Sequence, residues 1–163
     1  MTKRSIAVAL AALGFSLAAA ADDRLARFDG GIGVIPTGSA NTTVRGVPAA
    51  GQIWVISRLT ADIRSDGSIT VDGRGLLLGA GNTVGTTNNL SVIATLICQV
   101  GAAFEEHSTN LAGVPLEPNG DFRINDVISS APRDCASPVL LIRNSAANAA
   151  GVRGWFAAGI PKL

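Results

Sequence analysis

The sequence predicts an all-β protein, a single-domain antiparallel β-sandwich or small barrel with one disulfide. A long apolar segment at 91–100, an alternating segment at 59–72 and a pair of cysteines support this prediction. The 19 glycines, together with many Ser, Thr and Asn residues, indicate frequent turns between short strands. The length of 163 residues corresponds to one domain.

The first 21 residues have the order of a secretory signal peptide. Lys3 and Arg4 are basic, residues 6–17 carry no charge and are mostly apolar, and residues 18–21 are alanines. The apolar part is about a dozen residues long, whereas a membrane-spanning helix needs roughly 20. We therefore expect cleavage after Ala20 or Ala21, a secreted or periplasmic β-domain over residues 22–163, and no membrane span after cleavage.

The segment from Ser91 to Val100 is the expected centre of the fold. It is rich in β-branched residues, has no charged residue, no Pro and no Gly, and includes one of the two cysteines. Because it lacks polar alternation, it fits a strand that is buried on both faces. In an exported chain, the simplest state of Cys98 and Cys135 is a disulfide that closes a loop of about 37 residues.

Apolar and polar residues also alternate on both sides of a Ser-Asp-Gly sequence at 65–67, which predicts a β-hairpin. A two-residue turn would set Ile63 opposite Thr70, an apolar side chain against a polar one. A three-residue turn with Gly67 in the left-handed conformation sets Ile63 opposite Ile69. Since opposed residues share a face, burial of one face requires the three-residue turn.

The remaining strands are expected to be short. Charged residues followed by glycines at 22–31 suggest a frayed start, and residues 104–107 are expected to be irregular. The strands predicted from apolar content and turn signals are Gly33–Pro36, Phe122–Val127, and a terminal hairpin of Val139–Arg143 with Gly154–Ile160.

The charge balance argues against nucleic-acid binding. Removal of Lys3 and Arg4 leaves 11 of the 13 basic residues against 12 acidic ones, a net charge of −1 without a basic cluster. Such a domain lacks the positive patch that attracts phosphate backbones.

The chain contains one histidine, so a multi-histidine zinc centre is excluded. His107 and Glu105 could share a face of an extended segment, and Asp121 or Asp126 could complete an acid/base pair or a cation site. A solvated loop of charged residues is the simpler interpretation. No nucleophile motif or cofactor motif is present, so no catalytic, cofactor-binding or metal-binding residue is assigned.

These observations favour a non-enzymatic exported domain that binds a protein or a small ligand. The weakly charged composition, rich in Ala, Gly, Thr and Asn, also fits a structural subunit of a surface assembly. A small hydrolase or metal-assisted enzyme that uses Glu105, His107 and an aspartate is a third hypothesis.

Overall fold

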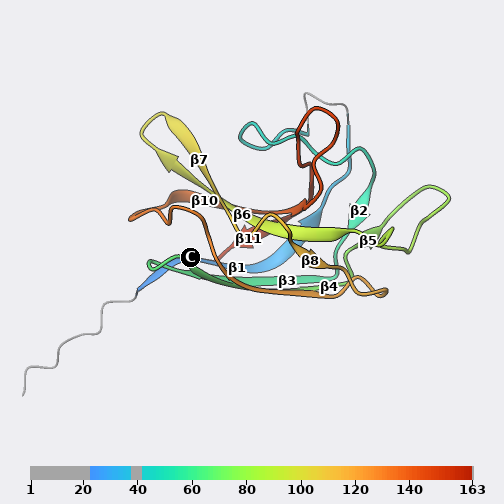
Figure 1. Cartoon of the computed structure of the whole chain (residues 1–163), viewed down its shortest axis with the longest axis horizontal. Coiled ribbons are helices and arrows are strands. Elements are labelled where there is room, and N and C mark those ends of the chain that lie inside the picture. The colour runs from blue at the N-terminus through green and yellow to red at the C-terminus, as the bar shows by residue number, and fades with distance from the viewer. Residues whose placement is uncertain (1–22, 38–41, 163) are drawn as a thin grey trace, which may run out of the picture.

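The computed structural model describes residues 23–37 and 42–162 (Figure 1). The expected signal peptide at 1–21 lies outside these residues. The strands are β1 (Arg24–Gly33), β2 (Trp54–Val55), β3 (Arg58–Arg64), β4 (Ser68–Arg74), β5 (Leu77–Leu78), β6 (Ser91–Val100), β7 (Ala103–Ser108), β8 (Val114–Pro115), β9 (Phe122–Val127), β10 (Ala136–Asn144) and β11 (Trp155–Pro161). Within the described residues, no helix is long and apolar enough to cross a membrane.

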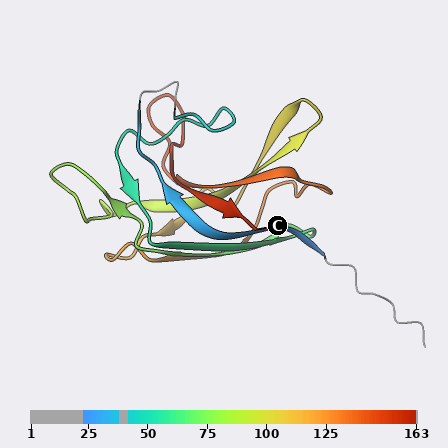
Figure 2. The same cartoon turned by 180° about the vertical axis from the view of Figure 1, so that it is seen from behind.

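The strands form one large sheet and one small sheet. The large sheet has the order β7-β6-β10-β11-β1-β3-β4-β9, with β8 paired to β6, and β2 pairs with β5 in the small sheet. All of these pairs are antiparallel. The large sheet curls around the core as an incomplete barrel (Figures 1 and 2). The predicted all-β, antiparallel fold class is confirmed.

The predicted hairpin is formed by β3 and β4 with the three-residue turn. Ile63 pairs with Ile69 and Ala61 pairs with Val71, while Gly67 has a φ of 86°. These apolar side chains face the core, and the residues between them face outward. The chain just before β3 and the chain just after β4 pair with each other as β2 and β5, which form the small sheet.

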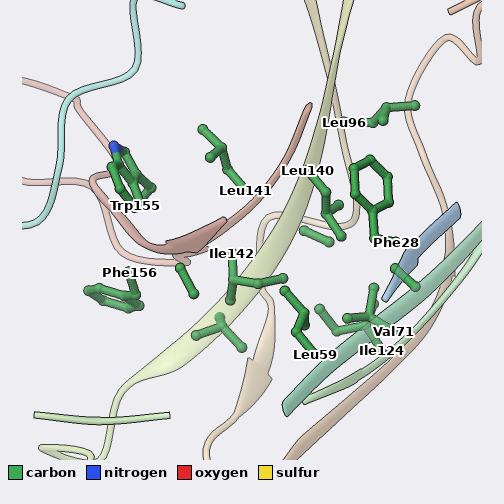
Figure 3. Close-up of a cluster of buried hydrophobic side chains, with 14 of the residues drawn as sticks. Phe28, Leu59, Val71, Leu96, Ile124, Leu140, Leu141, Ile142, Trp155 and Phe156 are labelled. Atoms are coloured by element: carbon green, nitrogen blue, oxygen red, sulfur yellow. The ribbon is translucent and has the colours of Figure 1, made fainter. Parts of the chain in front are cut away.

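β6 is buried on both faces, as its lack of charge and of polar alternation predicts, because two different layers cover it. Residues 92–98 are all buried. Leu140, Ile142 and Phe156 pack on the concave side, whereas Leu141 and Trp155 lie on the opposite side of the strands (Figure 3). Segment 42–50 covers that opposite side, where the Trp155 indole donates a hydrogen bond to the carbonyl of Thr42. The sheet therefore has a core on each side at its centre.

The predicted disulfide between Cys98 and Cys135 is present. It pins one end of segment 128–135, which leads from β9 to β10. The other end is held at β7, where the Ser129 amide donates to the Ser108 carbonyl at 2.8 Å. We call segment 128–135 the crossing segment. A disulfide at this position is typical of proteins that fold in an oxidising compartment.

The terminal hairpin is also confirmed, since β10 and β11 pair directly. Three predictions for local structure are wrong. The strand expected at Gly33–Pro36 does not form, because β1 ends at Gly33 and residues 34–36 belong to no strand. The expected frayed start is β1, an interior strand between β11 and β3, because Ala26 and Phe28 pack into the core while the charged residues beside them face outward. The expected irregular segment at 104–107 is β7, which pairs with β6 through a tight turn at 101–102.

Candidate functional site

His107 lies on β7 with its side chain 4% exposed. Its Nδ1 lies 3.1 Å from the carbonyl oxygen of Ser129, which can only accept a hydrogen bond, so in the neutral ring Nδ1 carries the proton. The other ring nitrogen, Nε2, is buried without a hydrogen-bond partner among the described residues and lies 4.0 Å from a Glu105 carboxylate oxygen. His107 therefore fastens the crossing segment to β7. The expected solvated loop is wrong at this position.

The carboxylates that were predicted to accompany His107 lie apart. Asp126 accepts hydrogen bonds from the amides of Asn110 at 2.7 Å and Val127 at 2.8 Å. Asp121 lies beyond the other end of β9, where it accepts hydrogen bonds from Arg74 and from the amide of Gly75. The two aspartates are five positions apart along an extended chain, which corresponds to roughly 16 Å.

The four candidate residues thus do not meet in one site. Glu105 is exposed, His107 faces the interior, and each aspartate caps backbone amides in a different place. Over residues 23–37 and 42–162, no group of three His, Cys, Asp or Glu side chains is arranged to hold a metal ion. The structure gives the acid/base hypothesis no geometric support.

A different polar site lies on the outer face of β1, β3 and β4, where a cleft of about 260 Å³ opens. Its side chains occupy the strand positions that alternate with core residues, so the hairpin that builds the core also builds the cleft. The polar lining includes Arg27, Asp29, Arg58, Thr60, Asp62 and Asp72. We call this site the arginine cleft.

The carboxylates of the arginine cleft are each paired with a cation. The pairs are Asp29 with Lys162 at 2.8 Å, Asp62 with Arg24 at 2.8 Å, and Asp72 with Arg123 at 2.7 Å. Hydrogen bonds from Arg123 and Arg74 lower the pKa of Asp72, and the hydrogen bond from Lys162 lowers the pKa of Asp29. Because both pKa values are lowered, these carboxylates are ionised at neutral pH.

Arg27 and Arg58 are the two charged residues of the cleft lining that take no part in these ion pairs. Neither side chain forms a hydrogen bond or an ion pair within the described part of the chain, although Arg27 lies directly across from Asp62 in the sheet register. Asp62 binds Arg24 instead. Both guanidinium groups act electrostatically on Asp29, whose carboxylate is bound by Lys162. The arginine cleft therefore contains two guanidinium groups that have no hydrogen bond or salt bridge to a carboxylate among the described residues.

Sequence reasoning did not find this cleft. Arg27 and Arg58 are 31 positions apart, and only the β1–β3 register places them on one face. The available signal was the alternation of charged residues with Ala26 and Phe28 at the start of the domain. No known protein family, no curated protein and no solved structure matches the chain.

Proposed function

We propose that this chain is an exported, non-enzymatic binding module that holds an acidic sugar in the arginine cleft. The observation that carries the proposal is the presence of Arg27 and Arg58, without protein partners, in a cleft whose carboxylates are already paired. An anionic ligand can accept hydrogen bonds from both guanidinium groups, whereas their positive charges would repel a cation.

The chemistry of the lining favours an acidic sugar over a simple anion. A planar guanidinium can donate two parallel hydrogen bonds to one carboxylate of a ligand. The aspartates of the cleft retain oxygen atoms that can accept hydrogen bonds from sugar hydroxyls, and Thr60 can donate or accept. A uronic acid unit carries both kinds of group, a carboxylate and several hydroxyls.

Two independent features support the proposed cellular location of the protein. The N-terminal sequence has the order of a signal peptide, and the Cys98–Cys135 disulfide suits an oxidising compartment. Together they favour a secreted or periplasmic protein, which would meet acidic polysaccharides outside the cytoplasm.

The test is isothermal titration with trigalacturonate, and with its methyl ester as a ligand of the same rings without charge. We expect binding of the acid and little binding of the ester. Arg27→Ala and Arg58→Ala should each weaken binding about ten- to a hundredfold, as expected when a charged hydrogen bond worth about 1.5–3 kcal/mol is lost. Binding should weaken as the salt concentration rises.

The matched control is Arg64→Ala. Arg64 is an exposed arginine on β3 that pairs with Asp23 and does not line the arginine cleft. Its replacement should leave the affinity unchanged. Between pH 5 and 8 the affinity should also stay constant, because the lowered pKa values of Asp29 and Asp72 keep these carboxylates ionised in this range. Equal affinity for the acid and the methyl ester would contradict the proposal.

A further inference from the structure

The crossing segment is held unevenly along its length. At Ser129, the amide donates to the Ser108 carbonyl at 2.8 Å, the hydroxyl accepts from the Ser108 amide, and the carbonyl is bound by His107. Residues 130–135, in contrast, form no hydrogen bond and no ion pair within the described part of the chain. Apart from the packing of Ala131 against the core, the disulfide is therefore what restrains these six residues.

Two serines in the left-handed backbone region stand at the ends of this part of the chain. Ser130 has a φ of 48°, and Ser137, near the start of β10, has a φ of 46°. Residues with a Cβ rarely adopt this conformation, which persists only where the surrounding structure imposes it. The restrained segment is thus attached through a strained residue on each side, and opening of the disulfide allows both serines to relax.

The two cysteines of the disulfide differ in exposure. Cys98 is completely buried on β6, whereas Cys135 is partly exposed and lines a cleft of about 660 Å³. The lining of this cleft includes two arginines and two aspartates, so no net charge repels an anionic thiolate. A thiolate must reach the sulfur that it attacks, and exposed disulfides are the ones that exchange with external thiols. The accessible position here is Cys135.

We propose that the disulfide is a redox-sensitive fastening of the crossing segment, and that Cys135 is the residue that an external dithiol attacks. A thiolate of the dithiol forms a bond to the Cys135 sulfur while the bond to Cys98 breaks, and Cys98 leaves as a thiolate that takes a proton from solvent. The second thiol of the reductant then displaces Cys135, which is protonated in turn, and the reductant departs as its own disulfide. Two electrons pass from the dithiol to the protein.

The opening is local. The hydrogen bonds at Ser129 keep the crossing segment attached to β7, while residues 130–135 become a loose segment because they have few other contacts. The backbone pairing of β6 with β10 does not involve the sulfur atoms, so the large sheet stays intact. No residue of the crossing segment lines the arginine cleft, and the inference is therefore independent of the proposed ligand.

Brief treatment of the native oxidised protein with glutathione, a monothiol, traps the first step of the exchange. After an acid quench and alkylation of free thiols in denaturant, peptide mapping by mass spectrometry should find glutathione on Cys135 and the alkyl label on Cys98. Glutathione on Cys98 would overturn the inference. So would an adduct that forms only when urea has unfolded the protein.

Limited proteolysis measures the release of the segment. In the presence of dithiothreitol, trypsin should cut after Arg133 at least about tenfold faster than in the oxidised protein, because proteases cleave loose exposed chain. The Cys98→Ala/Cys135→Ala variant should be cut at this fast rate with and without reductant. Arg133→Gln is the control that assigns the cut, and it should remove this fragment from the digest.

The same digest distinguishes local opening from unfolding. Arg27, in the interior strand β1, should remain uncut while the bond after Arg133 is cleaved. A reduced protein that is cut after Arg133 no faster than the oxidised protein would contradict the proposal. Cleavage after Arg27 at the same rate as after Arg133 would also contradict it, because the sheet would then have unfolded with the disulfide.

Discussion

Replacement of both Cys98 and Cys135 by alanine should lower the free energy of unfolding of the oxidised protein by about 4 kcal/mol. The disulfide closes a loop with a sequence separation of 37, and the chain-entropy account assigns about this stabilisation to such a loop. Since single domains are stable by only about 5–15 kcal/mol, this loss is a large fraction of the total.

The structure gives a local reason for the effect. The crossing segment is fixed at Cys135 by the disulfide and at Ser129 by hydrogen bonds to β7. Without the disulfide, the Cys135 end of the segment would lose this link, and the hydrogen bonds of Ser129 would hold only the other end. Urea denaturation with and without a reductant measures the difference. The reductant should bring the wild-type protein to the stability of the double variant and leave the variant unchanged, and equal stabilities in the absence of reductant would refute the prediction.

Gly33→Ala should destabilise the fold by about 3 kcal/mol, at the upper end of the usual cost of overpacking. A Cβ atom at Gly33 would lie 2.1 Å from the carbonyl oxygen of Trp54, a backbone atom that cannot rotate away. At this point the small sheet is joined to the large one, because the Trp54 amide donates to the Val34 carbonyl and the Val34 amide donates to Phe156.

Gly51→Ala is the matched control for this prediction. A Cβ at Gly51 would meet no atom within 4 Å, and the residue does not have a positive φ. The control should change the free energy of unfolding by less than about 1 kcal/mol, in either direction. Urea denaturation of the two variants side by side is the measurement. If both variants were as stable as the wild-type protein, the close approach of β1 and β2 would be wrong.

The parts of the fold that the sequence predicted are those set by local patterns. The three-residue turn at Gly67 followed from the need to place Ile63 and Ile69 on one face, and the burial of 92–98 followed from a segment without charged residues or polar alternation. The disulfide followed from the count of two cysteines in a chain with a signal-peptide pattern.

The parts that were missed depend on partners distant in the sequence. β1 has charged residues at alternate positions and several glycines, a pattern that also fits a frayed terminus. Its strand conformation depends on pairing with β3 and β11 and on the burial of Phe28. β7 has mostly exposed side chains, so its strand conformation comes from the ladder with β6 and not from its own pattern.

The site could not be predicted for the same reason. Sequence proximity drew attention to Glu105 and His107, yet the pleat of β7 and the crossing segment place His107 in the interior. The two arginines without partners became visible only when the sheet register and the full set of ion pairs were known. A site built across strands carries no compact sequence motif.

The most direct test of the proposed function is an amide chemical-shift titration of the protein with trigalacturonate. We predict that the amides of Thr60, Asp62 and Thr70, which line the arginine cleft, shift progressively and saturate, and that Arg58→Ala greatly reduces these shifts. Shifts confined to the β7–β9 side, around Ser108 and Asp126, or no shifts at millimolar ligand, would contradict the assignment of the arginine cleft as the binding site.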